Sequence, residues 1–484
     1  MSRVVVIGAG AAGLAVSARL AATGHDVTLL ERAPVVGGKL GVAHLGGRTF
    51  DTGPSLLTLP HVYQELFDDV GLPAAARPRL ARLDPACRYR FADGTWLDLP
   101  GERAAVPSAL DTALGPGAGA QWDALLRRGE AMWRVTEGPF LSSAPSARDL
   151  LRLSRRIGDV RTIAPWRTLR GLGRRYLTDP RLRAMLDRYA TYAGSDPRRA
   201  PAAFATIPFV EQEFGSWHVV GGLRRLADAL LAAAVHAGAR VRCDAEVTRV
   251  LVAGGRVAGV RLADGEELAA DVVVSAVDAA VLHGRLLADP PPSRPGPSSL
   301  SGLVLLLGLR GRDPGAAHHT VLFAEDYDAE FDAVLGARRR PVPAPTVYVC
   351  APADDALRPP DGESWFVLVN APPHGAGVDW DEPGLADRYA ERLLDLMAAR
   401  GLDVRHRIAR LDVRTPADLE RDTGSPGGAI YGAASHGARA AFRRPANRSA
   451  LPGLYLAGGS AHPGGGLPLV AMSARIVARL VGPA

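Results

Sequence analysis

Three glycines near the N-terminus have the spacing of a dinucleotide-binding turn. Gly8, Gly10 and Gly13 follow an apolar run at 4–7 and precede a helix expected over 14–22. The first glycine permits a tight turn, the second lets the backbone approach a pyrophosphate, and the third allows close packing of helix on strand. The motif alone is weak evidence and also fits a turn without a ligand, but its strand–turn–helix context predicts a bound dinucleotide.

The residues that follow this turn indicate which dinucleotide is bound. Glu31 ends the next expected strand, where its carboxylate can accept hydrogen bonds from ribose hydroxyls and would repel the 2′-phosphate of NADP. After Arg32 come Gly37-Gly38-Lys39 and then the loop Phe50-Asp51-Thr52-Gly53-Pro54-Ser55. An NAD enzyme has no need of this second loop, which could wrap the flavin side of a longer dinucleotide. We therefore predict FAD.

A second group of glycines lies near the C-terminus. The stretch 453–460 reads as a strand followed by Ala-Gly-Gly-Ser, and 462–468 reads His-Pro-Gly-Gly-Gly-Leu-Pro before a helix expected over 470–480. A helix N-terminus attracts negative charge, and reduced flavin carries negative charge around its pyrimidine ring. We expect this segment to contact the flavin, although a glycine-rich loop before an ordinary terminal helix gives the same pattern.

The expected elements alternate between strands and helices, which predicts an α/β fold with a discontinuous cofactor domain. We assign 1–75, 217–285 and 418–484 to this domain, and 76–216 and 286–417 to a substrate-binding and membrane-associating region. Outside the two glycine-rich ends, helices are expected at 223–236 and 384–400, and strands at 240–242, 247–252, 272–276, 303–309, 346–350 and 365–370.

Composition excludes several classes of protein. The chain has 484 residues, a net charge of +6 and Lys39 as its single lysine, which is too weak a positive charge to indicate nucleic-acid binding. Its three cysteines, at 87, 243 and 350, are isolated from one another and form neither a metal motif nor a disulfide framework. No apolar run reaches the roughly 18 residues of a spanning helix, so we expect a cytoplasmic protein or one bound to a membrane surface.

At this level of detail the sequence resembles the bacterial phytoene-desaturase-type carotenoid desaturases, within the flavin amine oxidase superfamily. The resemblance covers nearly the whole chain. It rests on GAGAAG, ER…GGK, FDTGPS, DRYATYAGSDPRRAP at 187–201, GSWHVVGGL at 215–223, ADVVVSAVD at 270–278, HHTVLFAEDYDAEF at 318–331, TPADLE at 415–420, GGAIYG at 427–432 and RPANRSALPGLYLAGGSAHPGGGLPLV at 444–470. True amine oxidases commonly carry an acidic residue after the AG pair, where this chain has Gly459 and Ser460.

The resemblance implies a Rossmann-type FAD-binding domain with an inserted α+β substrate domain. It also implies hydride transfer from an allylic carbon of a carotenoid or related polyene isoprenoid to flavin N5, with oxygen or a membrane quinone as the final electron acceptor. The FAD contacts expected from the motifs and the resemblance are Gly8, Gly10, Gly13, Glu31, Arg32, Gly38, Lys39, Gly53, Pro54, Val247, Gly458, Gly459, Leu467, Pro468, Leu469 and Val470.

Catalytic residues are less evident. A polyene can spread developing positive charge, so no strong base is required; His318, His319 and His462 are weak candidates. The aromatic residues Tyr189, Tyr192, Phe209, Phe214 and Trp217 could line a polyene channel or equally pack in the core.

The segment 148–176 mixes arginine with Leu, Ile and Trp166, as an interfacial amphipathic helix or a solvated arginine-rich helix would. An interfacial amphipathic helix at this position predicts peripheral association with the cytoplasmic membrane.

Other functions share these motifs. A polyene isomerase or a terminal-methyl carotenoid oxidase belongs to the same family. A soluble flavin amine oxidase would have a small aromatic-lined pocket, and a non-catalytic isoprenoid-binding escort protein would be colourless because it holds no flavin.

Overall fold

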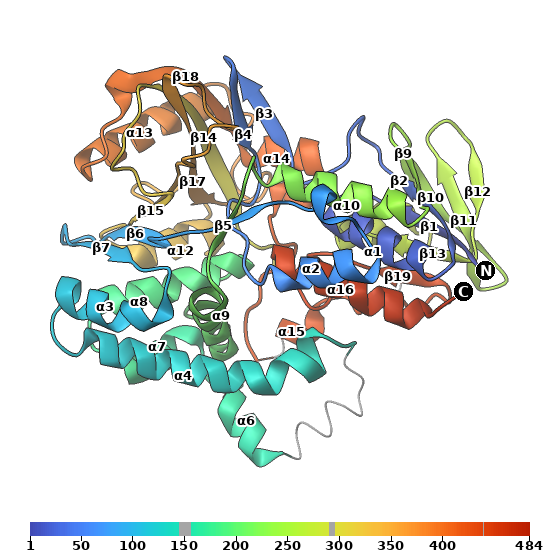
Figure 1. Cartoon of the computed structure of the whole chain (residues 1–484), viewed down its shortest axis with the longest axis horizontal. Coiled ribbons are helices and arrows are strands. Elements are labelled where there is room, and N and C mark those ends of the chain that lie inside the picture. Colours follow the sequence, from blue (N-terminus) through green and yellow to red (C-terminus); the bar gives the residue numbers. More distant parts are fainter. Residues whose placement is uncertain (145–155, 290–295, 439) are drawn as a thin grey trace.

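The computed structural model describes residues 1–144, 156–289, 296–438 and 440–484. The chain forms a parallel sheet with its helices, a larger mixed sheet beside it, and a layer of helices below the mixed sheet in the view of Figure 1. No helix in these described ranges is long and apolar enough to cross a membrane.

The parallel sheet has five strands in the order β19 (Leu454–Leu456), β13 (Val272–Ser275), β1 (Arg3–Ile7), β2 (Asp26–Leu30) and β9 (Arg240–Arg242). Helix α1 (Ala11–Ala22) packs between α10 (Arg224–His236) and α16 (Leu467–Val481). On the other face lies the antiparallel sheet β10 (Val247–Ala253), β11 (Arg256–Leu262) and β12 (Glu267–Ala269), packed through one apolar cluster. The predicted α/β fold with a Rossmann-type unit is confirmed.

The mixed sheet has seven strands. Their order is β18 (Ile408–Arg414), β14 (Ser301–Arg310), β17 (Gly362–Ala371), β16 (Val347–Cys350), β15 (His319–Leu322), β6 (Cys87–Arg90) and β7 (Trp96–Leu99). Along β14, Leu303, Leu305, Leu307 and Leu309 face α13 (Leu385–Ala399), while Val304 and Leu306 face the opposite side with Phe50. Because side chains alternate along a strand, one apolar run supplies both a core and a second apolar surface.

The helical layer is the part that the sequence did not predict. It comprises α3 (Val106–Leu114), α4 (Ala118–Thr136), η3 (Glu137–Leu141), α6 (Ile157–Ile163), α7 (Leu169–Tyr176), α8 (Pro180–Arg188), η4 (Tyr189–Ala193), η5 (Ala202–Ala205) and α9 (Thr206–Phe214). Apart from α4, these helices have nine residues or fewer, which is too short for a one-sided periodicity to stand out in sequence. In α4, buried positions at Trp122, Leu125, Leu126, Gly129 and Met132 do have helical spacing, so this helix could have been predicted.

The segment predicted as one amphipathic helix over 148–176 is not continuous, and its part at 148–155 lies outside the described residues. Helices α6 and α7 are separated at Ala164, which has a φ of 50° and precedes Pro165. A residue before proline is disfavoured in a helix. Leu169 and Leu172 of α7 are buried in the protein, so only the part around α6 keeps an exposed apolar surface.

The remaining elements are short connections between these layers. They are β3 (Val42–Leu45), β4 (Arg48–Asp51), α2 (His61–Asp69), η1 (Ala74–Ala76), β5 (Leu80–Arg82), η2 (Arg103–Ala105), β8 (Trp217–Val219), α11 (Ala279–Val281), η6 (Leu282–Leu286), α12 (Tyr327–Leu335), η7 (Arg405–Arg407), α14 (Pro416–Thr423), η8 (Pro426–Gly428) and α15 (Ala440–Arg443).

Asn447 joins the last strand, the loop after it and the last helix. Its buried Nδ2 lies 3.0 Å from Leu456 O, 2.8 Å from His462 O and 3.0 Å from Ser473 Oγ, so its two N–H groups are shared among three acceptors. The Ser473 hydroxyl in turn donates to His462 O and accepts from Gly458 N. One side-chain amide therefore fixes the path of the C-terminal glycine loop.

Replacing Asn447 by leucine is expected to lower the free energy of unfolding by about 2–3 kcal/mol, because buried acceptors lose their donor. Urea or thermal denaturation measures this change. The exposed Ala450→Ser variant in the same loop is the control, with an expected change within about 0.5 kcal/mol. Equal stability of the two variants would show that the amide contributes nothing.

Candidate functional site

A cavity of about 560 Å³ lies where the parallel sheet, the mixed sheet and the helical layer meet. Both glycine-rich segments line it, and so do side chains of β14, β15, β16, β17, α8 and α9. Residues far apart in the sequence therefore form one continuous space. Its wall divides into a glycine-rich part, an apolar part and a polar part contributed by the helical layer.

The first glycine turn has the geometry of a dinucleotide cradle. Gly8 has a φ of 92°, which a side chain would strain, and it lines the cavity with Gly10. A Cβ on Gly13 would lie 1.9 Å from Gly8 O, so this glycine permits the close approach of α1 to β1. No described side chain caps the N-terminus of α1, whose first amide groups are left for a ligand.

Glu31 lies at the end of β2 on the wall of the cavity. Its carboxylate accepts from Ala9 N at 2.7 Å and from Ala33 N at 3.0 Å, one bond to each oxygen. A carboxylate oxygen has more than one acceptor site. These backbone bonds therefore hold the group in place while leaving it able to accept from a ribose hydroxyl.

Lys39 ties the N-terminal loop to a segment nearly 400 residues later. Its ammonium donates to Ile430 O at 2.8 Å, and Ala429 O lies at 3.4 Å. Burial lowers the lysine pKa, an effect that the negative charge of Asp278 opposes. The single lysine of the chain thus lies on the wall of the cavity.

The C-terminal loop approaches the cavity as backbone. A Cβ on Gly465 would lie 2.6 Å from Tyr431 Cδ1, and one on Gly459 would lie 3.3 Å from Gly465 Cα. The buried Arg444 guanidinium donates to Gly459 O at 2.8 Å and to Tyr431 O at 3.2 Å, and burial lowers its pKa to about 10. No described side chain caps α16, so a second helix N-terminus is open toward the cavity.

The wall of the cavity includes most residues predicted to bind the cofactor. Gly13 and Leu469 do not line it. The predicted residues that do are Gly8, Gly10, Glu31, Arg32, Gly38, Lys39, Gly53, Pro54, Val247, Gly458, Gly459, Leu467, Pro468 and Val470. Two open helix N-termini, a carboxylate at the end of β2 and glycine surfaces where a Cβ would collide with its neighbours all fit a flavin dinucleotide.

His462 was predicted to contact the flavin, but the structure places it elsewhere. Its Nε2 lies 2.7 Å from Phe140 O and 3.0 Å from Ser143 O, and the residue is not part of the cavity wall. Burial lowers the imidazole pKa. His462 therefore connects the C-terminal loop to the end of the α4 region, which corrects its proposed catalytic role.

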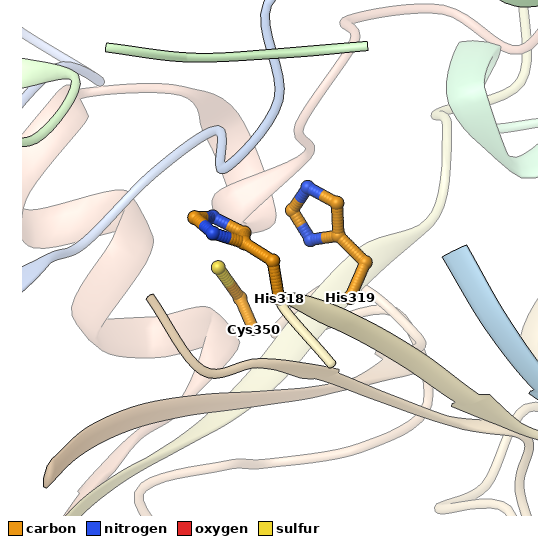
Figure 2. Close-up of side chains that lie close together, drawn as sticks. All are labelled: His318, His319 and Cys350. Atoms are coloured by element: carbon orange, nitrogen blue, oxygen red, sulfur yellow. The ribbon is translucent and has the colours of Figure 1, made fainter. Parts of the chain in front are cut away.

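His318 and His319 lie beside Cys350, as Figure 2 shows. Ligand atoms of the three residues lie within 4.8 Å of one another, because His319 and Cys350 are paired on β15 and β16. His319 lines the cavity, and its Nδ1 is 2.8 Å from the Tyr348 hydroxyl. Burial lowers the pKa of both imidazoles, that of His318 to about 3, so both are neutral.

The Nε2 atom of His319 has no hydrogen-bond partner among the described residues, and neither does that of His318. His318 does not line the cavity. Its ring lies 4.7 Å from that of His218 in a tilted arrangement, and the Nε2 of His218 is 2.7 Å from Asp354 Oδ2. Of the three predicted histidines, only His319 can reach a ligand in the cavity.

The aromatic residues predicted to line a channel mostly pack elsewhere. Only Tyr192 lies on the cavity wall. Tyr189 is fully buried and donates to Glu211, while Phe209, Phe214 and Trp217 pack in the aromatic core behind it. Short aromatic-rich helices do not reveal in sequence which face meets a cavity, so four of these five predictions are corrected.

Sequence reasoning missed the rest of the wall. The apolar part comes from the β14 and β17 surface that faces away from α13, namely Val304, Leu306, Phe366 and Leu368. The polar part includes two charged residues of the helical layer, Arg188 on α8 and Glu211 on α9. Period-two alternation could have revealed the first set, whereas no local pattern marks the second.

Comparisons with known proteins agree with this architecture. Residues 11–482 match the family of flavin containing amine oxidoreductases. The chain is 35% identical to a 4,4′-diapolycopene oxygenase of Methylomonas sp, covering 98% of this chain and 97% of the relative. It is 36% identical to a hydroxyneurosporene desaturase of Rubrivivax gelatinosus, covering 98% and 92% of the two chains.

Solved structures give the fold at lower sequence identity. Wild-type putrescine oxidase bound to putrescine matches with a TM-score of 0.65 at 14% identity, covering 99% of this chain and 98% of that one. Cyclohexylamine oxidase from Brevibacterium oxydans IH-35A matches with a TM-score of 0.61 at 15% identity, with the same coverage. The family model and the full-length relatives show that the chain belongs to the flavin containing amine oxidoreductase family and, within it, to the carotenoid desaturases and oxygenases.

Proposed function

We propose that this protein is an FAD-dependent oxidoreductase that desaturates a carotenoid or related polyene isoprenoid. The observation that carries the proposal is the continuity of the cavity. The glycine loops of the cofactor region and the apolar surface of β14 and β17 line the same space. A long apolar substrate on that surface would lie next to a dinucleotide in the glycine loops.

When bound, FAD supplies the two-electron oxidant that removal of two hydrogens from a carbon–carbon bond requires. The uncapped N-termini of α1 and α16 would attract its negatively charged parts, and Glu31, held by Ala9 N, would accept from ribose hydroxyls. We propose oxygen or a membrane quinone as the final electron acceptor.

The apolar wall would bind the polyene chain and exclude water from the reacting carbons. Val304 and Leu306 on β14 face Phe366 and Leu368 on β17 across paired positions, which gives a continuous apolar strip. His319 is the remaining candidate for holding a proton, at an Nε2 atom that has no hydrogen-bond partner in the described part of the chain. Because burial lowers its pKa, this imidazole is neutral before it accepts the proton.

A neutral polyene needs only the apolar part of this wall, whereas an ammonium group would need a carboxylate. Glu211 is a carboxyl group on the wall, but the Arg188 guanidinium lies on the same wall and is 8% exposed. Its positive charge would oppose any attraction of an ammonium group to Glu211 in a medium of low dielectric constant. This arrangement favours a polyene over an amine as the substrate.

The surface around α6 supports contact with a membrane. Ile157 and Trp166 are 65% and 63% exposed, beside the exposed arginines 156, 161 and 167. Figure 1 shows α6 projecting from the helical layer at the lower edge of the molecule. Exposed apolar side chains flanked by arginine suit the interface of an anionic bilayer, from which an insoluble polyene would be drawn.

The first test concerns the cofactor. Glu31→Ala is expected to weaken FAD binding about tenfold or more, since hydrogen bonds to a carboxylate are lost. The flavin absorbance retained per chain after gel filtration, and a titration of the stripped protein, measure the effect. Glu267→Ala removes an exposed carboxylate of β12 and should leave the titration unchanged. Unchanged affinity in Glu31→Ala would contradict the assignment.

The second test concerns the reaction. Expression in hosts that accumulate different carotenoid intermediates should yield pigments that have lost two hydrogens per step and absorb at longer wavelength. Mass spectrometry and absorption spectra identify the products against a host with an empty vector. A product that is an isomer of unchanged mass would contradict desaturation and indicate a polyene isomerase. A product with a terminal aldehyde or acid would indicate a terminal-methyl carotenoid oxidase. A colourless protein that leaves every pigment unchanged would contradict both enzyme functions and indicate a non-catalytic isoprenoid-binding escort protein.

The third test concerns the membrane. Trp166→Glu should lower binding to anionic vesicles about tenfold, because an apolar anchor is replaced by a charge that the lipid repels. Vesicle cosedimentation measures the partition. Trp96→Glu, at a 43% exposed tryptophan of β7, is the matched control and should bind as the unmodified protein does. An equal loss in both variants would place the contact elsewhere.

A further inference from the structure

Two strands of the mixed sheet bring two imidazoles and a thiol together beside the cavity. His319 on β15 is paired with Cys350 on β16, and His318 directly precedes His319 in the chain. One nitrogen of each imidazole and the sulfur all lie within 4.8 Å of one another. Figure 2 shows both rings and the sulfur on the same side of these strands. The group arises from strand pairing, so no local spacing in the sequence marks it.

Both imidazoles of this group have a nitrogen that lacks a partner. The Nε2 atoms of His318 and His319 are buried and form no hydrogen bond with any described residue, and His319 is 3% exposed. A buried polar atom without a partner costs free energy, and an ion is one of the ligands that can satisfy it. Two such nitrogens beside a thiol sulfur form a donor set that suits a metal ion.

The other ring nitrogen of His319 is already held. Its Nδ1 lies 2.8 Å from the Tyr348 hydroxyl, which lies 2.6 Å from Ser55 Oγ. When Nδ1 donates to Tyr348 and Tyr348 donates to Ser55, the Nε2 atom of the imidazole keeps a free lone pair. A metal-binding histidine commonly donates its second N–H to such a partner, which fixes the orientation of the ring. Tyr348 is therefore a positioning residue for His319.

Charged side chains of both signs lie near this group. Asp51 interacts electrostatically with Cys350 and Asp354 with His318, whereas the Arg188 guanidinium interacts with the other imidazole. A cation held between the three ligands would therefore have a carboxyl group on the thiol side and another on the side of His318. These two groups offset the repulsion from the guanidinium.

We propose that His318, His319 and Cys350 bind one zinc-type metal ion through the two Nε2 atoms and the Cys350 thiolate. Thiolate and imidazole ligands select Zn²⁺ and related ions over Mg²⁺ and Ca²⁺, which prefer oxygen ligands. Bonds of about 2.0–2.3 Å place tetrahedral ligand atoms roughly 3.5 Å apart, so side-chain rotation must close the group by up to about 1 Å. The thiol releases its proton to solvent as the metal binds, and water takes the fourth position.

A second group of the described residues suits a metal less well. Ligand atoms of His374, Asp379 and Asp381 also lie within 4.8 Å of one another, but the two aspartates are exposed. The His374 Nδ1 accepts from Trp380 N, and Asp381 is paired with Arg421. Its donor atoms are thus largely in use, and the group serves as a control for the buried one.

A metal at the buried group would change what His319 can do. It would occupy the same Nε2 atom that would hold a proton during desaturation, so metal binding and proton transfer at this atom exclude each other. The metal site does not depend on the proposed function. Metal affinity is therefore measured separately from turnover of polyenes.

Titration of the flavin-loaded protein with Zn²⁺, after dialysis against a chelator, tests the assignment. One ion per chain should bind with a Kd of about 1 μM or lower, and excess Mg²⁺ should not compete. X-ray absorption at the zinc edge should show one sulfur at about 2.3 Å together with nitrogen or oxygen ligands at about 2.0–2.1 Å.

Variants assign the ligands. Cys350→Ser should weaken Zn²⁺ binding about 100-fold and remove the sulfur signal, because the soft ligand is lost. Cys87→Ser is the matched control, since Cys87 is also a buried thiol of the mixed sheet but is not part of the group. This control and His374→Ala should bind as the unmodified protein does. Tyr348→Phe should weaken binding about 10–100-fold with the sulfur signal retained, because the ring of His319 loses its partner.

A Kd in the millimolar range, or a bound zinc ion without a sulfur ligand, would overturn the inference. An equal loss of affinity in Cys350→Ser and Cys87→Ser would also overturn it, as would a loss in His374→Ala as large as that in Cys350→Ser. Thermal melting identifies any variant that is unfolded. If Cys350→Ser is unfolded, His318→Ala takes its place, and unchanged zinc affinity in that variant would contradict the site.

Discussion

The contact between Gly13 and Gly8 fixes the geometry on which the candidate site depends. A Cβ on Gly13 would lie 1.9 Å from Gly8 O, so α1 can approach β1 only because residue 13 has no side chain. This approach brings the N-terminus of α1 to the carboxyl ends of β1 and β2, where Glu31 lies. The open amide groups and the carboxylate then face one space, as the carboxyl edge of a parallel sheet commonly allows.

Long-range hydrogen bonds hold the other parts of the wall against this turn. Asp51 at the end of β4 accepts from Leu223 N at 2.8 Å and from Arg224 N at 3.2 Å, at the start of α10. Asp354 similarly accepts from Gly221 N at 2.6 Å. Burial raises the pKa of Asp51, an effect that its two backbone donors oppose. Carboxylates of β4 and of the loop after β16 thus bind the backbone that leads into α10, which packs on α1 of the cofactor region.

The sequence predicted those parts of the molecule that local spacing encodes. Gly8, Gly10 and Glu31 could be assigned because a turn and the strand after it contain all the information, and the alternation of β14 could be read from its leucines. His462 was misassigned because proximity in sequence to the glycine loop suggested proximity to the ligand. Its cis peptide with Pro463 is part of a loop whose carbonyl groups bind Asn447 instead.

The polar wall could not be predicted for a different reason. Arg188 and Glu211 lie 23 positions apart on separate helices, and they reach the cavity only through packing of the helical layer against β15 and β16. An arginine-rich chain offers many arginines, and nothing in the sequence separates Arg188 from the paired Arg170. Only the three-dimensional structure shows that Arg170 is paired with carboxylates and that Arg188 lies on the cavity wall.

The wall of the cavity offers two kinds of surface to a ligand. The β14 and β17 surface offers no hydrogen-bonding side chain at Val304, Leu306, Phe366 or Leu368, so it selects for length and apolarity. Arg188 and Glu211 instead place charged or hydrogen-bonding groups on the polar part of the wall, where a buried polar group without a partner costs free energy. An apolar strip alone would allow a long apolar ligand to slide along its length. A polar contact at one point of the wall would fix the register of such a ligand, and with it which of its bonds lies beside the glycine loops.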